Sequence, residues 1–473
     1  MNININNNFK KQDTINTRIK SIGDLLANNK LQPIVDYKNN NLETEQFTNP
    51  NSYRHIESNS PESPLSHASH ISQDNKSSDT RIALNKNMYD FYDIITKIGG
   101  RLKYIKSGTT GHTFKGEIKD DNDETISSYA VKVVAYPKKE RYGDIHDLSR
   151  PENAEIMMIR LLSYFVVKKQ TPHITLPMGT FNTDIKPFLT LVEDGIVDKD
   201  NKKYIEFVDK YKKEDYYHPV VSILINEWAN RGDLLDFIRK YYKEFTPTTW
   251  KVIFFQIISV LAVIQSKFPS FRHNDLKANN ILIHKLKQRG NTLSYIVNKQ
   301  SYYVPNIGYQ IKIWDFDFAC IPGIVDNTKV SSKWTENINV TPEQNRYYDL
   351  HYFFNTLIKP GFFNEFMKDS CVPKEAQDFI NRIIPTKLQN ESKYVSARGR
   401  ILINKEFYIP DEILKKDEYF KEFREAAKIN KLNKVNHNLK TKTEVLVDNV
   451  TDNVTDLDKL LYDDYKKNIK NTN

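Results

Sequence analysis

Cysteine is scarce in this sequence, and no apolar run is long enough to cross a membrane. Only two cysteines, Cys320 and Cys371, occur in 473 residues, and they form no Cys-x-x-Cys pair. A disulfide scaffold or a cysteine-based zinc site is therefore not expected, and a reducing compartment fits. The most apolar stretch, Val252–Ile264, is interrupted by Gln256 and Ser259 and is shorter than the roughly 20 residues that span a bilayer. The first residues lack a signal-peptide core, so the sequence predicts a soluble, cytoplasmic protein without a membrane span.

The chain also lacks a strong excess of one charge. Its 69 Lys and Arg residues against 60 Asp and Glu residues give a net charge of +9. This charge is compatible with nucleic-acid binding, but Asn, Lys and Ile are abundant along the whole chain. A compositional bias explains the excess as well, and nucleic acid is not the expected partner. A mean hydropathy of −0.62 with 39% hydrophobic residues indicates polar termini around a globular middle.

Composition divides the chain into an arm, a domain and a tail. Residues 1–86 are rich in Asn, Ser, Gln and His, and they have too little apolar surface to offset the entropy cost of folding. We expect a disordered arm there, with a short helix around 22–31. Residues 426–473 alternate Lys, Asn and Asp and are expected to form a loosely attached charged tail. A single large domain is left at 87–425.

The order of the expected elements indicates an α+β fold. Short β-branched runs predict strands, and apolar residues at helical spacing predict helices. Strands are expected at 131–134, 188–192 and 221–225, and helices at 154–167, 234–240 and 250–267. A strand-rich region before a helix-rich one predicts two lobes with a cleft between them. The boundaries are about 87–228 for a small β-rich lobe and about 229–425 for a larger helical lobe.

The strongest chemical signal is the sequence His-Asn-Asp-Leu-Lys-Ala-Asn-Asn at 273–280. Phosphoryl transfer to a hydroxyl needs a carboxylate that orients the nucleophile, a cation near the phosphoryl group and an oxygen ligand for magnesium. Asp275, Lys277 and Asn280 supply these three groups within six residues. The alternative interpretation is a polar turn before the apolar strand at 281–283.

A second motif follows at 311–317, with the sequence Ile-Lys-Ile-Trp-Asp-Phe-Asp. Asp315 stands at the end of an apolar strand, where a carboxylate can hold magnesium against the β- and γ-phosphates. Alone, this pattern is an ordinary strand end. Because it follows the first motif in the expected order along the chain, it predicts phosphoryl transfer from ATP.

The two motifs resemble the catalytic loop and the Asp-Phe-Gly motif of the eukaryotic-type protein kinase superfamily, and the resemblance covers about residues 90–425. The chain differs at Asn274, where arginine is usual, and at Asp317, where glycine is usual. The Asp-Phe-Asp variant and the run at 347–354 are similar to serine/threonine kinases of poxviruses and other large DNA viruses. The resemblance implies a bilobal kinase fold and phosphorylation of protein serine or threonine. For a viral kinase it also implies a location in the host cytoplasm or the virion.

The resemblance also implies roles for the residues of both motifs. Asp275 is the expected catalytic base, and Lys277 is the expected phosphate contact. Asn280 and Asp315 are the expected ligands of Mg²⁺, with Mn²⁺ as a possible substitute.

The remaining parts of an ATP site follow from the same resemblance. The segment from Lys106 to Thr113 resembles a glycine-rich loop, with Gly108 and Gly111 allowing the backbone to approach the phosphates. Lys106 stands where the family has its first glycine. Lys132, between apolar neighbours, matches the strand lysine that contacts the α- and β-phosphates, although a strand lysine is more often a solvated edge charge.

A helix carboxylate is expected to pair with Lys132. Glu155 is the preferred partner because apolar residues follow it on an inward helix face, and Glu152 is the alternative. Either residue could instead be an exposed glutamate at a helix N-terminus, which the helix dipole favours, and this role fits Glu152 better.

The segment from 225 to 234 resembles the kinase hinge. The backbone groups of Glu227 and Ala229 are expected to bind adenine, and Asp233 the ribose hydroxyls. An N-cap role is a credible alternative for Asp233, and the two roles do not exclude each other. Asp349, on a helix with an apolar face, is expected to brace the catalytic loop, and 285–309 reads as an insertion.

Two departures from the family pattern predict an enzyme that is active without phosphorylation of the segment after Asp315. Asn274 has no charge with which to bind an activation-loop phosphate, and Asp317 adds a Cβ where unusual torsions are common.

Two other functions stay open: a small-molecule or lipid kinase of related fold, and a catalytically inactive scaffold. The sequence specifies neither the substrate nor the oligomeric state.

Overall fold

The computed structural model describes Arg18, Lys20 and residues 86–429, except for 109, 121, 287–291, 331 and 391. The helix expected around 22–31 and nearly all of the tail expected at 426–473 lie outside the described residues. The boundaries of the arm, domain and tail therefore stay predictions.

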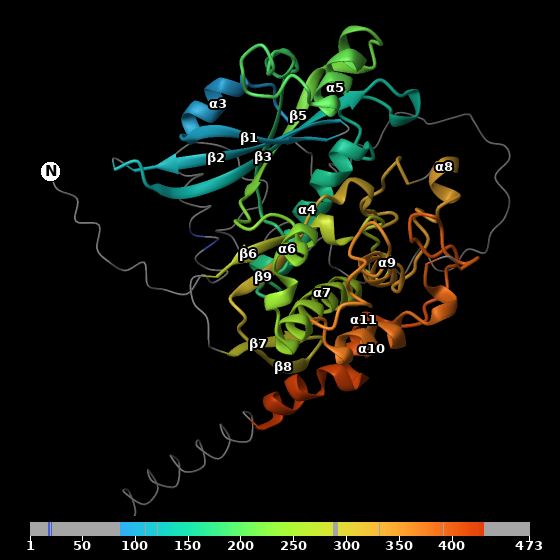
Figure 1. The fold of residues 1–473 in the computed structure, drawn as a ribbon. Coiled ribbons are helices and arrows are strands. Elements are labelled where there is room, and N and C mark those ends of the chain that lie inside the picture. Colours follow the sequence, from blue (N-terminus) through green and yellow to red (C-terminus); the bar gives the residue numbers. More distant parts are fainter. Residues whose placement is uncertain are drawn as a thin grey trace, which may run out of the picture.

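The largest sheet has five strands in the order β1-β2-β3-β5-β4, and every neighbouring pair is antiparallel. Figure 1 shows this sheet above a group of helices, with α4 between them. Mixed helix and strand content is thus confirmed. The strands are β1 Arg101–Ser107, β2 Gly111–Lys119, β3 Thr125–Pro137, β4 Pro177–Asp184 and β5 Tyr217–Glu227.

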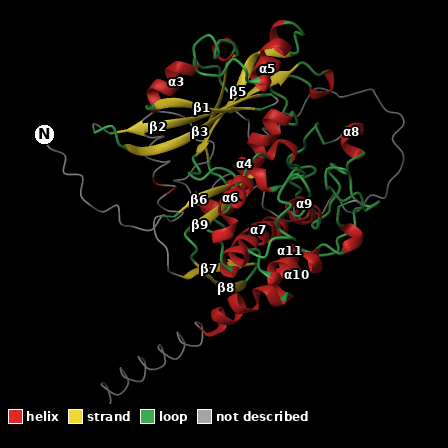
Figure 2. Ribbon diagram, viewed as in Figure 1, coloured by secondary structure: helices red, strands yellow, loops and turns green. Residues whose placement is uncertain are grey.

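Three helices belong to this part of the chain and are drawn red in Figure 2: α3 precedes β1, α4 lies between β3 and β4, and α5 lies between β4 and β5. Helix α3 spans Phe91–Ile98, α4 spans Pro151–Val167 and α5 spans Lys202–Lys212. Alternation along β3 separates its two faces: Val131 and Val133 are buried in the core, so Lys132 projects to the opposite face. Because α4 begins with proline at its first position, its start is well defined.

The strand expected at 188–192 is wrong. Lys186–Phe188 forms a 3₁₀ helix, and turns follow it. Pro187 removes one backbone donor from a ladder, and the Phe188 ring packs on Phe91 of α3 with centroids 4.9 Å apart. The apolar residues of this segment therefore fill the core beside the sheet, while the pairing strand is β4.

Helix α7, Pro247–Lys267, is the centre of the helical part. The side chain of Thr246 caps it, accepting from the backbone N–H of Thr249 at 3.2 Å. Among the described residues it is the one helix long and apolar enough to cross a membrane, but 78% of its apolar window is buried inside the structure, as for a core helix. The other helices of this part are α6 Leu234–Tyr241, α8 Lys333–Glu336, α9 Tyr348–Leu357, α10 Lys374–Ile383 and α11 Pro410–Lys416.

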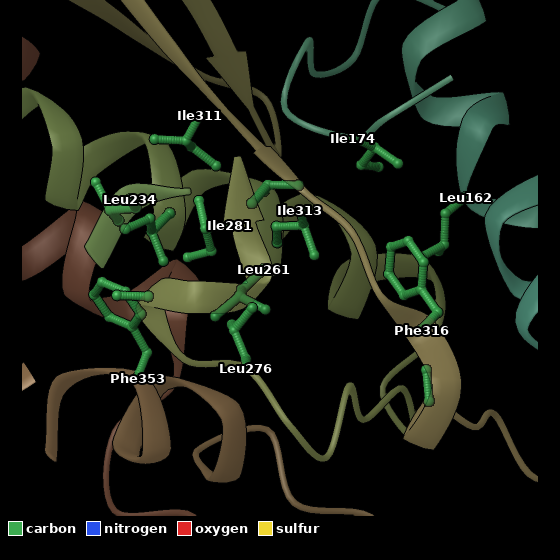
Figure 3. Packing of buried hydrophobic residues seen from close by; sticks show 14 of the residues in the cluster. Leu162, Ile174, Leu234, Leu261, Leu276, Ile281, Ile311, Ile313, Phe316 and Phe353 are labelled. Atoms are coloured by element: carbon green, nitrogen blue, oxygen red, sulfur yellow. The ribbon is translucent and has the colours of Figure 1, made fainter. Parts of the chain in front are cut away.

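The remaining named strands form two small two-stranded sheets. Strands β6 (Ile281–Lys285) and β9 (Tyr309–Ile313) pair antiparallel, and between them β7 (Thr292–Val297) pairs with β8 (Gln300–Pro305). The segment expected as an insertion at 285–309 thus contains a hairpin of its own. Figure 3 shows side chains of β6 and β9 packed with residues of α7 and the catalytic loop. The labelled residues there include Leu261, Leu276, Ile281 and Ile313.

Candidate active site

Strand β3 brings a lysine between two carboxylates. The Lys132 ammonium lies 2.6 Å from an oxygen of Glu155 on α4 and 2.7 Å from an oxygen of Asp315. The expected Lys132–Glu155 pair is therefore present, and the alternative, Glu152, instead pairs with Arg150 at 3.2 Å. Just beyond Asp315, Phe316 packs beside α4, as Figure 3 shows.

Burial and charge act in opposite directions on this group. Burial by itself lowers the pKa of Lys132, but Asp315 and Glu155 outweigh it and hold that pKa above its usual value. Burial likewise acts to raise the pKa of Asp315, yet Lys132 keeps it at about 2. For Glu155 burial prevails and raises the pKa to about 7. At neutral pH Lys132 is charged and Asp315 is ionised, the states required for phosphate and metal binding.

Helix α9 supports the catalytic loop through hydrogen bonds between Asp349 and the loop backbone. The fully buried Asp349 accepts hydrogen bonds from the backbone N–H groups of His273 at 2.7 Å and Asn274 at 2.9 Å. Asn274 has a φ of 63°, so this part of the loop has a backbone shape that needs support. The bracing role expected for Asp349 is confirmed.

The carboxylate of Asp275 has three polar neighbours. Its Oδ2 accepts from the Lys277 ammonium at 2.6 Å and from Asn280 Nδ2 at 2.9 Å. Its Oδ1 accepts from the guanidinium of Arg400. The loop thus brings together the three residues predicted from the sequence and adds Arg400.

The residues expected to bind magnesium fit a small hard cation. Asn280 uses its Nδ2 to donate to the backbone oxygen and carboxylate of Asp275, so its amide oxygen is turned away from those contacts. The side chain of Asp315 is 31% exposed. No group of three or more His, Cys, Asp or Glu residues suited to a metal occurs among the described residues. Mg²⁺ does not require one, because it usually takes one or two protein ligands plus substrate phosphates.

The glycine-rich loop joins β1 and β2. Gly108 donates its N–H to the Gly111 carbonyl at 2.7 Å, which closes the turn. Lys106 lies over the Trp314 ring at 5.9 Å, and Thr113 is the strand partner of Lys132.

The two glycines have different surroundings. A Cβ on Gly111 would lie 1.9 Å from the Val133 carbonyl oxygen, whereas the nearest atom to a Cβ on Gly108 is 3.7 Å away. Gly111 is therefore required by the contact between β2 and β3, a reason that differs from the expected approach to phosphates.

A Gly111→Ala variant is expected to lose about 1–3 kcal/mol of unfolding free energy, because β2 and β3 must separate to admit the methyl group. For a chain of this size that corresponds to a fall in Tm of several degrees. Gly108→Ala serves as the control and is expected to melt close to wild type. Equal melting temperatures for the two variants in thermal unfolding would contradict the strand-contact explanation.

The segment expected to be the hinge begins in the last residues of β5. The Glu227 carboxylate contacts the guanidinium of Arg18, accepts from the Leu176 N–H at 2.8 Å and lies 3.5 Å from the Lys312 ammonium. Although burial opposes ionisation, Arg18 and Lys312 hold the pKa of Glu227 at about 2. Arg18 also donates to the carbonyls of residues 172 and 174. This contact from the amino-terminal arm was not anticipated from composition.

The two other hinge residues lie just beyond β5. Ala229 is buried. Asp233 caps α6 by accepting from the Asp236 N–H at 3.0 Å, so its expected N-cap role is confirmed.

Side-chain hydrogen bonds and an ion pair within the chain hold the segment after Asp315 in place. The Asn274 side chain donates to the carbonyls of Phe318 at 3.1 Å and Thr341 at 3.3 Å. Asp317 forms an ion pair with Lys329 and lies in the 3₁₀ helix Phe316–Phe318. The unusual torsion falls instead on Asp315, whose φ is 64°. The strain expected at position 317 is therefore absent from it.

Arg272 also holds the segment after Asp315, through hydrogen bonds to residues near its end. Its guanidinium donates to Thr341 Oγ1 and the Glu343 carbonyl, both at 3.0 Å, and lies 3.8 Å from the Tyr348 ring centroid. Sequence reasoning missed Arg272, Arg400 and Arg18. For Arg272, the available signal was its position directly before the catalytic loop.

A strand lysine paired with a helix glutamate, a metal-site aspartate beside them and an Asp-x-Lys-x-x-Asn loop are the features that define a protein kinase. Comparison with known proteins agrees. The model of the poxvirus serine/threonine protein kinase family matches residues 145–416, more than half of the chain, and the chain belongs to that family.

Individual relatives are also viral. A protein of Acanthamoeba polyphaga mimivirus described as a serine/threonine-protein kinase is 48% identical over 348 residues, covering 72% of this chain and 73% of the relative. Serine/threonine-protein kinase 2 of fowlpox virus is 29% identical over 199 residues, covering 38% of this chain and 39% of its own length. The monkeypox virus kinase of the same name is 32% identical over 133 residues, covering 28% of this chain and 27% of the relative.

Proposed function

We propose that this protein transfers the γ-phosphate of ATP to serine or threonine hydroxyls of proteins. The observation that carries the proposal is the Lys132–Glu155 ion pair with Asp315 beside it, since active kinases need the lysine–glutamate pair and an aspartate placed to hold Mg²⁺. The proposal includes a bilobal arrangement, with ATP between a β-rich lobe at about 87–228 and a helical lobe at about 229–425. The host cytoplasm or the virion, both of which would give access to protein substrates, is the proposed location.

In this proposal the nucleotide is held along its whole length. The backbone of Glu227 and Ala229 binds adenine, Asp233 binds the ribose, and Lys132 contacts the α- and β-phosphates. Asn280 and Asp315 would hold Mg²⁺, which neutralises phosphate charge during transfer.

The catalytic loop would then act on the hydroxyl of the substrate. Asp275 orients that hydroxyl and accepts its proton as the new P–O bond forms and the bond to ADP breaks. Lys277, now 2.6 Å from Asp275, would turn toward the γ-phosphate. Because its ammonium carries three donors on a flexible stem, it can make this exchange without a change in the backbone.

Two alternatives are less well supported. A lipid or small-molecule kinase would use Asp317 as a further metal ligand, but Asp317 is paired with Lys329. An inactive scaffold is expected to have lost one of the central groups, whereas the described residues include them all.

Incubation with labelled ATP and Mg²⁺ and a panel of proteins, lipids and small alcohols separates the three functions. Label is expected in protein serine or threonine. Label in lipid or a small molecule alone would support the first alternative, and no label despite ATP binding would support the second.

The segment after Asp315 is expected to work without phosphorylation. Its contacts through Asn274, Arg272 and Lys329 already hold it in place, so a phosphate has nothing left to order. Protein treated with phosphatase, and shown by mass spectrometry to lack phosphate, is expected to keep more than about a tenth of its turnover. A larger loss, above 1.4 kcal/mol in barrier terms, would reveal a phosphate switch. The hydroxyls to examine are those of Thr328, Ser331, Ser332, Thr335 and Thr341.

A further inference from the structure

A short hairpin at 394–402 carries an arginine to the catalytic loop. Its backbone closes through hydrogen bonds from Ser396 N–H to the Arg400 carbonyl and from Leu402 N–H to the Tyr394 carbonyl, both 2.8 Å. At its turn Gly399 has a φ of 88°, a conformation that favours glycine. The hairpin therefore has a defined shape of its own.

Helix α9 fixes this hairpin against the domain. Asn355 Nδ2 donates to the Gly399 carbonyl at 2.8 Å, and Asn390 Nδ2 donates to the Asn355 carbonyl at 3.1 Å. Since α9 also carries Asp349, which braces the catalytic loop, one helix sets the positions of both the loop and the hairpin.

The Arg400 side chain is enclosed rather than solvated. It is 4% exposed, and its guanidinium lies 4.3 Å from the Tyr352 ring centroid. Its buried Nε has no hydrogen-bond partner among the described residues. The Asp275 carboxylate of the catalytic loop is therefore an acceptor for a buried, permanently charged group.

The two oxygens of Asp275 have separate partners. Oδ1 accepts from Arg400, whereas Oδ2 accepts from Lys277 and Asn280. Lys277 is 24% exposed, but Arg400 is 5% exposed at its side chain. The partner of Oδ2 can leave, and the partner of Oδ1 is packed in place.

We propose that Arg400 is a positioning residue that holds Asp275 by Oδ1 throughout catalysis and so presents Oδ2 to the substrate hydroxyl. The proposal rests on the proposed kinase function, in which Lys277 moves to the γ-phosphate and uncovers Oδ2. A carboxylate gripped at one oxygen cannot rotate about its Cβ–Cγ bond, so the proton acceptor keeps its geometry when its other partner departs.

The test is an Arg400→Met variant assayed for kcat and for KM of ATP. We expect kcat to fall about 10- to 100-fold, the usual cost of a misplaced catalytic group, with KM for ATP within a few-fold of wild type. Arg398→Met is the matched control, since Arg398 is an exposed residue of the same hairpin, and it is expected to match wild type.

Arg400→Lys keeps a charge but not the planar fork, and we expect it to restore part of kcat. Circular dichroism and thermal melting show whether the methionine variant folds. If it does not fold, Arg400→Lys tests the proposal instead. A lowered kcat with unchanged KM for ATP in Arg400→Lys supports the positioning role, and wild-type kinetics overturn it. A folded Arg400→Met protein with unchanged kcat overturns the proposal. A more active variant also overturns it and identifies Arg400 as an inhibitory contact. Absence of phosphoryl transfer by the wild-type protein would instead refute the proposed function.

Discussion

An Asp275→Asn variant is expected to transfer phosphate about 10²–10⁴ times more slowly than wild type while binding ATP almost normally. The amide cannot accept the proton of the hydroxyl, and its contacts with Lys277 and Arg400 lose their ionic character. The proposed nucleotide contacts of Lys132 and the hinge are unchanged. Initial rates at saturating ATP, together with ATP affinity from calorimetry, measure the two quantities separately.

The matched control is Asp236→Asn, an exposed aspartate on α6, for which we expect wild-type kinetics. If Asp275→Asn retained turnover within a few-fold of wild type, Asp275 would not be the base. If it lost ATP binding to the same extent as turnover, the residue would serve the structure of the loop instead.

Lys132→Met is expected to weaken ATP binding and turnover together, because it removes a charge-assisted phosphate contact. It should also cost about 3 kcal/mol of unfolding free energy, the lower end of the range for breaking a buried pair, since Asp315 is partly exposed. Lys138→Met is the control, because this lysine beyond the end of β3 pairs with an exposed aspartate. Kinetics and urea unfolding of both variants provide the measurement.

The loss of stability in Lys132→Met has a predictable pH dependence. Burial already raises the pKa of Glu155 from 4.5 to about 7, and without Lys132 the folded state holds that proton more firmly. The unfolded state releases it near 4.5, so the stability of the variant falls as pH rises through 4.5 to 7 and beyond. Unfolding at pH 6 and pH 8 should show a larger decrease in the variant than in wild type. Equal decreases would mean that Glu155 does not take up the proton.

The catalytic loop could be predicted because its chemistry is local. Asp275, Lys277 and Asn280 lie within six residues, so one loop must bring them together. The Lys132–Glu155 pair was predictable from burial: both residues are flanked by apolar neighbours that fix which way they face. The roles at the nucleotide remain proposals, since they depend on groups beyond the polypeptide.

Other features depend on distant contacts that leave little trace in sequence. Arg400 meets Asp275 across 125 positions, and only the packing of the hairpin on α9 brings them together. The false strand at 188–192 arose because β-branched and aromatic residues serve a packed turn as well as a strand. Gly111 was expected because of the phosphates, and its contact with Val133 was not predicted, because that close approach is set by sheet pairing.

The Arg18–Glu227 contact joins two distant parts of one chain, so its strength is governed by tethering. Chain connection can give an effective concentration up to about millimolar, which dilution of the protein does not change. A separate arginine-bearing molecule at micromolar concentration would therefore compete poorly for the same carboxylate. Cleavage of the chain between Arg18 and the domain would turn the contact into a bimolecular one that dilution dissolves. The Arg18–Glu227 contact is therefore expected to persist on dilution when the amino-terminal arm is intact and to be lost when the arm is cleaved.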